Sequence, residues 1–225
     1  MTDNRRDKID TVLSQRQPDL TVLAEKLHKP RNFSAIIRTC DAVGINEVHA
    51  VPGDDGVSIH WNTSQGAEKW MNVRQHDNLP GACSYLRERG FQLIAADLSD
   101  RAVDYREIDY TLPTALMIGT ELFGVSEEAL AESDRQIVIP MKGMTQSLNV
   151  SVACAIVLYE AHRQREAAGC YGLRLLDEKI SNNQRFEWLH PVVARFCRER
   201  GIEYPEIDDA GNVVGSFPRG TAQGS

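Results

Sequence analysis

The chain has 225 residues, of which 42% are hydrophobic and 25% charged, a composition typical of a soluble globular protein with one domain of moderate size. It has no signal-peptide core and no apolar run of membrane-spanning length, and its five cysteines include no CxxC pair, so we expect no membrane span, disulfide framework or zinc site. The net charge of −7, taken alone, speaks against a nucleic-acid partner.

The first third of the chain alternates between helical and strand patterns. Residues 3–17 read as a short polar helix, and residues 20–27 read as the first strand. A helix follows and ends at Gly44, a residue type that commonly terminates helices. Its predicted apolar stripe consists of Ala35, Ile36, Thr39, Ala42 and Val43.

The middle of the chain continues the alternation. Further strands are predicted at residues 47–51, 72–76, 91–96, 113–118 and 136–139, and further helices at 79–89, 126–131 and 184–200. This order predicts an α/β fold with a mostly parallel sheet and helices on both faces. Such sheets bind ligands at the carboxyl ends of their strands.

A stretch near residue 140 combines a strand, a tight loop and a helix start. Pro140 ends a β-branched run, and Ser147 and Asn149 are good N-cap types at the start of the next helix. From Val150 onward, apolar residues recur at helical spacing. Helix N-termini and loop amides offer hydrogen-bond donors to a ligand, although an ordinary βα turn has the same pattern.

Three segments in this order resemble the motifs of one enzyme family. They are KPRNFSAIIRTCDAVG at 29–44, LMIGTELFGVSEEAL at 116–130 and PMKGMTQSLNVSVA at 140–153. They resemble the SPOUT superfamily of methyltransferases, in the SpoU (TrmH-like) branch that methylates ribose 2′-hydroxyls of RNA. Within that branch, the amino-acid sequence most resembles the bacterial enzymes that modify the D-loop guanosine at position 18 of tRNA.

The resemblance implies a fold, a methyl donor and an assembly. The fold is a SPOUT domain at residues 19–167 with a C-terminal deep trefoil knot, flanked by a helical extension at 1–18 and a helical extension with a tail at 168–225. The donor is S-adenosyl-L-methionine, and no metal is expected. Two subunits form a homodimer through the knot region, with Arg38 of one serving the donor bound to the other.

The resemblance also implies the residues of the site. Three loops at the knot are expected to hold the donor through Ala96, Gly119, Thr120, Ile139, Met141 and Leu148. The residues matching the catalytic set are Arg38, Asn32, Glu121, Ser147 and Asn149. Ile139, Met141 and Leu148 would pack against the adenine ring, and without the motif around them they would read as core residues.

Arg38 matches the catalytic arginine, which in the resembled enzymes handles the proton of the ribose hydroxyl. Since arginine stays charged in proteins, our hypothesis is that Arg38 binds the 3′-phosphate and polarises the 2′-hydroxyl, and that a phosphate oxygen or water accepts the proton. The alternatives are a salt bridge to Asp41, three residues further along the helix, or simple exposure to solvent.

The other catalytic candidates also have structural alternatives. Asn32 is placed by the resemblance to bond Arg38 or the substrate, but it could equally be a helix N-cap. Glu121 would help to order the site, or its carboxylate could favour the amides near Ser126. Ser147 and Asn149 would organise the loop and the opposing subunit.

Basic residues are unevenly distributed. Residues 1–38 hold eight Lys/Arg against five Asp/Glu and residues 161–200 also hold eight against five, whereas residues 39–160 hold eight against eighteen. We expect the two basic flanks to contact tRNA phosphates. The candidates are Arg5, Arg6, Lys8, Arg16, Arg163, Arg165, Arg195 and Arg198.

Other functions stay open from the sequence. A ribosomal-RNA 2′-O-methyltransferase and a non-catalytic RNA-binding homodimer of the same fold are the main alternatives. An unrelated nucleotide-binding α/β protein is disfavoured because the chain has neither GxGxxG nor a P-loop. The unpaired cysteines suit a reducing compartment, so we expect a cytoplasmic location.

Overall fold

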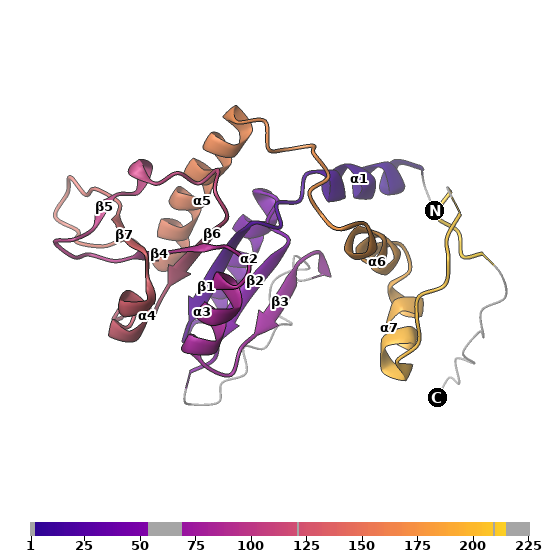
Figure 1. Cartoon of the computed structure of the whole chain (residues 1–225), viewed down its shortest axis with the longest axis horizontal. Helices are drawn as coiled ribbons and strands as arrows, with labels where there is room; N and C mark the ends of the chain where they lie inside the picture. Colours follow the sequence, from indigo (N-terminus) through magenta and orange to yellow (C-terminus); the bar gives the residue numbers. More distant parts are fainter. Residues whose placement is uncertain (1–2, 54–68, 121, 209, 215–225) are drawn as a thin grey trace. The chain divides into compact units, whose positions relative to one another are not determined.

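The computed structural model describes residues 3–53, 69–120, 122–208 and 210–214. Its contacts divide the chain into two units (Figure 1). One unit contains residues 15–175, and the other combines residues 1–14 with residues 176–225.

The larger unit is built on a seven-stranded sheet whose strands all pair in parallel. The strands are β1 (Leu20–Glu25), β2 (Glu47–Val51), β3 (Asn72–Gln75), β4 (Gln92–Ala96), β5 (Val103–Asp104), β6 (Thr114–Ile118) and β7 (Arg135–Val138). Their order in the sheet is β3-β2-β1-β6-β4-β7-β5. The predicted α/β fold with a parallel sheet is confirmed. The two-residue strand β5 was not predicted because it is too short to show a pattern.

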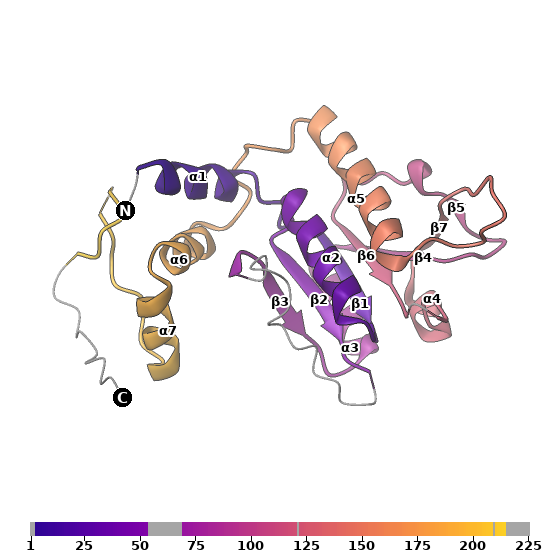
Figure 2. The same ribbon diagram turned by 180° about the vertical axis from the view of Figure 1, so that it is seen from behind.

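Helices cover both faces of this sheet, as predicted (Figures 1 and 2). The helices α2 (Pro30–Ala42) and α5 (Val150–Ala167) lie side by side on one face. The helices α3 (Leu79–Arg87) and α4 (Glu127–Glu132) lie on the other, and a short 3-10 helix, η3 (Tyr105–Glu107), follows β5. Two apolar clusters fill the two interfaces. The trefoil knot stays a prediction.

The buried face of α2 differs from the predicted stripe. Phe33, Ile36, Ile37 and Cys40 are buried, whereas Ala42 is exposed. The larger apolar side chains determine which face turns inward, because they bury more area than alanine or threonine. The helix begins at Pro30 after Lys29, so the prediction of Asn32 as an N-cap is wrong.

The smaller unit contains three helices within the described residues. They are α1 (Asp3–Ser14), α6 (Glu178–Leu189) and α7 (Pro191–Arg200). The single helix predicted at 184–200 is wrong, because Pro191 lacks an amide hydrogen and begins a separate helix. Asp10 pairs with Arg185 at 2.6 Å and thereby joins α1 to α6. Across the described residues, no helix is long and apolar enough to span a membrane.

Candidate functional site

A pocket of about 300 Å³ opens at the carboxyl ends of three neighbouring strands, β6, β4 and β7. Its size lies within the range of small-molecule sites. All six residues predicted to hold the donor line it: Ala96, Gly119, Thr120, Ile139, Met141 and Leu148. Its position agrees with the rule that parallel sheets bind ligands beyond the carboxyl ends of their strands.

The loop after β6 folds back on itself and forms one wall of the pocket. The amide of Thr120 donates to the carbonyl of Gly124 at 2.8 Å, and the amide of Gly124 donates back at 2.9 Å. A Cβ atom on Gly119 would lie 1.8 Å from the Gly124 carbonyl oxygen, so only glycine fits there. At the turn, Leu122 and Phe123 are exposed and line the pocket.

The pocket is also lined by a carboxylate that was not among the predicted site residues. Asp97 follows Ala96 directly at the end of β4 and lines the pocket. Its amide donates to the carbonyl of Ile137 at 3.0 Å, which continues the pairing of β4 with β7 and fixes the backbone there. Asp97 could have been predicted from the sequence, because it is a carboxylate at the carboxyl end of a predicted strand, where parallel sheets bind their ligands.

Two predicted catalytic residues from different motifs are in contact. The Nδ2 of Asn149 donates to the Oδ1 of Asn32 at 3.2 Å. The Oδ1 of Asn149 accepts from the backbone amide of Ser151 at 2.9 Å and from its hydroxyl at 2.6 Å, so Asn149 also caps α5. This pair ties the first turn of α2 to the start of α5. Ser147 is exposed and lines the pocket.

Arg38 is exposed on α2 and is not among the residues that line the pocket. Within the part of the chain that the structure describes, its guanidinium has no hydrogen-bond or ion-pair partner. The alternative of a salt bridge to Asp41 is wrong, because that carboxylate contacts Arg16 at 2.7 Å. Glu121, the fifth catalytic candidate, lies outside the described residues.

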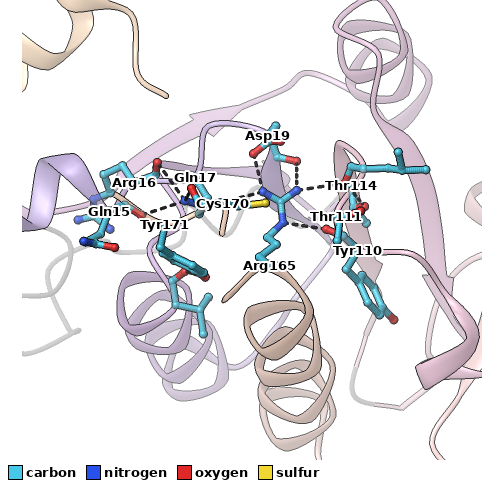
Figure 3. Close-up of polar contacts among 12 residues, drawn as sticks. Gln15, Arg16, Gln17, Asp19, Tyr110, Thr111, Thr114, Arg165, Cys170 and Tyr171 are labelled. Carbon is cyan, nitrogen blue, oxygen red and sulfur yellow. Dashed lines mark hydrogen bonds and ion pairs between the residues drawn. The ribbon is translucent and has the colours of Figure 1, made fainter. Parts of the chain in front are cut away.

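The prediction of RNA contacts is wrong for Arg16 and Arg165, whose side chains are fully buried. Arg165 donates five hydrogen bonds inside the protein (Figure 3). The acceptors include the Asp19 carboxylate at 2.6 Å and the Tyr110 carbonyl at 2.8 Å. Its spacing already gave a signal, because Arg165 continues the buried stripe of α5 four residues after Ala161.

The other basic candidates have accessible side chains. Arg5, Lys8 and Arg195 are exposed, and Arg6 is partly exposed. Arg163 is exposed but donates two hydrogen bonds to the Glu160 carboxylate, at 2.8 and 2.7 Å. Arg198 pairs with Glu187 at 3.2 Å. Arg6 also pairs with Asp7, at 3.4 Å. The arginines that pair with a carboxylate offer less uncompensated charge to a phosphate.

The titratable groups with large shifts contribute no nucleophile to the pocket. Burial raises the pKa of the Cys154 thiol to about 12, and burial raises that of Cys40 well above its usual range. Burial, followed by the neighbouring His76, lowers the pKa of His49 to about 3. Among the described residues, no group of three His, Cys, Asp or Glu side chains could hold a metal ion.

Fold and pocket together define an α/β protein with a small-molecule site at the end of a parallel sheet. Residues 19–159 match the SpoU rRNA Methylase family, and residues 163–216 match its C-terminal family (SpoU, rRNA methylase, C-terminal). The chain belongs to the SpoU rRNA Methylase family.

Relatives and solved structures agree with this membership. The chain is 46% identical over 216 residues to the tRNA (guanosine(18)-2′-O)-methyltransferase of Escherichia coli K12, covering 95% of this chain and 94% of the relative. It is 53% identical over 188 residues to the enzyme of the same name from Thermus thermophilus, covering 84% and 97%. The crystal structure of the A. aeolicus TrmH/SpoU tRNA modifying enzyme has a TM-score of 0.76 at 44% identity, covering 82% of this chain and 94% of that one.

A solved complex with a donor is also similar. The SpoU methyltransferase AviRb from Streptomyces viridochromogenes, in complex with the cofactor AdoMet, has a TM-score of 0.60 at 28% identity, covering 72% of this chain and 64% of that one.

Proposed function

We propose that this chain transfers a methyl group from S-adenosylmethionine to the ribose 2′-hydroxyl of guanosine 18 in the D-loop of tRNA. The observation that carries the proposal is the pocket at the ends of β6, β4 and β7, which is lined by residues of the second and third motifs and by residues 96–98. The curated relatives named for this activity are 46% and 53% identical over most of the chain, which favours tRNA over ribosomal RNA as the substrate.

The residues around the pocket suit S-adenosylmethionine. Ile139, Met141 and Leu148 offer an apolar wall for an adenine ring and keep water away from it. The Asp97 carboxylate, which also lines the pocket, suits sugar hydroxyls or a cationic group. When bound, the donor supplies a methyl group activated by its sulfonium.

Arg38 presents the acceptor. Its exposed guanidinium can bind an RNA phosphate through two parallel hydrogen bonds, and the same charge favours loss of the proton from the neighbouring 2′-hydroxyl. A phosphate oxygen or a water accepts that proton. Positioning the hydroxyl in line with the methyl group contributes much of the rate. Asn32, Asn149 and Ser147 keep the loop and the helix starts in place.

The active form is a homodimer in which Arg38 of one subunit serves the pocket of the other. Two observations support pairing. Arg38 does not line the pocket of its own chain, and α5 carries Val152 and Tyr159, which are 46% and 54% exposed and seven residues apart on one helical face. The enzyme acts in the cytoplasm. Its accessible basic side chains contact tRNA phosphates: Arg5, Arg6, Lys8, Arg163, Arg195 and Arg198.

The test is incubation of the purified chain with labelled S-adenosylmethionine and an unmodified tRNA transcript, followed by mapping of the methylated nucleoside. We expect one 2′-O-methylguanosine at position 18. A transcript with 2′-deoxyguanosine at that position lacks the acceptor oxygen and should take up no label. Label on a ribosomal-RNA fragment but not on tRNA would mean that ribosomal RNA is the substrate. No label on either RNA would contradict the proposal.

A further inference from the structure

Asp41 lies three residues after Arg38 on α2, and within the described residues its carboxylate contacts Arg16 and not Arg38. Residues three apart on a helix are neighbours, so an arginine and an aspartate at this spacing can form an ion pair. Here the Oδ1 of Asp41 accepts a hydrogen bond from the Nη2 of Arg16 at 2.7 Å. Arg38 has no partner within the described residues, although a carboxylate stands beside it on its own helix.

Arg16 is held rigidly in the position from which it takes this carboxylate. Its side chain is fully buried, and its Nη1 donates to the carbonyl of Ile45 at 2.8 Å. Its Nη2 donates to the carbonyl of Trp70 at 2.8 Å as well as to Asp41. The next residue, Gln17, fixes the backbone, because its amide donates to the carbonyl of Gly44 at 2.7 Å. Figure 3 shows Arg16 and Gln17 in this segment.

The electrostatic attraction between Arg16 and Asp41 is screened less than that of a surface pair. The Asp41 side chain is 33% exposed and the Arg16 side chain is not exposed at all. Water therefore screens the contact only in part, whereas a pair between Asp41 and the exposed Arg38 would be largely screened. Asp41 therefore pairs with the buried Arg16 and not with the exposed Arg38.

We infer that Arg16 is a positioning residue for Arg38. It binds and neutralises the one carboxylate on α2, which would otherwise pair with the Arg38 guanidinium or repel the RNA phosphate. The inference rests on the proposed role of Arg38. A free Asp41 carboxylate would compete with the RNA phosphate for the guanidinium, and its negative charge would repel that phosphate. Arg16 acts without touching either substrate.

The sharpest test places a new carboxylate beside Arg38 that Arg16 does not hold. Ala42 is exposed and lies four residues after Arg38, so Ala42→Glu adds such a carboxylate and Ala42→Gln adds the same bulk without charge. We expect Ala42→Glu to lower kcat/KM for tRNA about threefold to tenfold, as one nearby like charge in a partly screened site would. Ala42→Gln should stay within about twofold of wild type. Equal activity of the two variants would overturn the inference.

A second test removes Arg16 itself. Arg16→Met frees Asp41 and should lower kcat/KM, Asp41→Asn should have little effect, and the double variant should recover most of the loss because no carboxylate is left to compete. A merely structural arginine predicts the reverse, since the double variant would be no more active than Arg16→Met. Should Arg16→Met fail to fold, as followed by thermal unfolding, the Ala42 pair decides alone.

Wild-type methylation and S-adenosylhomocysteine binding are measured first. An inactive wild type would overturn the proposed function and with it the role of Arg38. An active wild type whose Ala42→Glu and Ala42→Gln variants behave alike would overturn only the role of Arg16. Donor binding should be the same in all variants, because neither Asp41 nor Ala42 lines the pocket.

Discussion

Asn149 donates a hydrogen bond to Asn32 across 3.2 Å, although 117 residues separate them in the chain. Asn32 lies in the first turn of α2, and Asn149 is the N-cap of α5. The two helices pack together on one face of the sheet (Figure 2). The contact therefore links the helix that carries Arg38 to the loop that lines the pocket.

Breaking this contact should reduce activity more than stability. We expect Asn32→Ala to cost about 1 kcal/mol in the free energy of unfolding, the typical net value of one hydrogen bond. Activity should fall at least about tenfold, because a misplaced reacting group is costly to the rate. Urea unfolding and single-turnover methylation measure the two effects.

Asn149→Asp separates the two contacts of Asn149. Its carboxylate still caps α5 at Ser151 but cannot donate to Asn32, so the helix cap is preserved and the link is lost. The double variant with Asn32→Ala should be no less active than the worse single variant. Fully additive losses would mean that the two side chains act independently.

Gly119→Ala should distort the wall of the pocket. The added Cβ would lie 1.8 Å from the Gly124 carbonyl oxygen, so the turn from Thr120 to Gly124 has to open. We expect a loss of stability of about 2 kcal/mol from the overpacking. Binding of S-adenosylhomocysteine, measured by titration calorimetry, should be undetectable. Gly143→Ala is the control, because a Cβ there meets open space; weakened binding in both variants alike would contradict the explanation.

Arg165 should be important for stability and Arg163 should not. Arg165→Met leaves the Asp19 carboxylate and several carbonyls without their donor, and breaking a buried pair costs about 3–5 kcal/mol. Arg163→Ala removes an exposed pair with Glu160 and should change the free energy of unfolding by less than about 1 kcal/mol. Urea denaturation compares the two, and equal stability would contradict the structural role of Arg165.

The sequence predicted the parallel sheet and the six pocket residues, because strand runs and motif wording are local properties. It did not predict that Arg16 and Arg165 are buried, because the partners that make burial possible lie far away in the chain: Asp41 is 25 residues from Arg16, and Tyr110 is 55 from Arg165. The contact between Asn32 and Asn149 was not predicted for the same reason, because a sequence pattern does not show which distant segments of the chain come together.

The break between α6 and α7 had a local signal that periodicity concealed. The apolar spacing continues across His190, whereas Pro191 removes one amide and starts a new helix. The narrow space at Gly119 arises only when the turn closes on Gly124, so a glycine in the sequence did not reveal it.

His49 should make the protein sensitive to mild acid. Its pKa is about 3 in the folded protein because the ring is buried, and the unfolded value is near 6.5. Between these values the unfolded chain binds a proton that the folded one does not, so stability is full above pH 6.5 and falls as the pH drops toward 3, by up to about 1.4 kcal/mol per pH unit. His49→Gln should reduce the difference in unfolding free energy between pH 7 and pH 5. An unchanged difference would show that other groups control it.

Arg38→Lys tests the central chemical role in the proposed reaction. Lysine keeps the charge but loses the planar guanidinium that binds a phosphate through two parallel hydrogen bonds. We expect kcat to fall about 100-fold or more, as for loss of a preorganised charge-stabilising donor, while the Kd for S-adenosylhomocysteine stays unchanged because the proposed contact of Arg38 is with the RNA phosphate and not with the methyl donor. Arg31→Lys makes the same exchange at another exposed position of α2 and should keep kcat within about twofold, since single surface charges contribute little. Near wild-type turnover of Arg38→Lys would mean that charge alone suffices and would rule out the phosphate clamp.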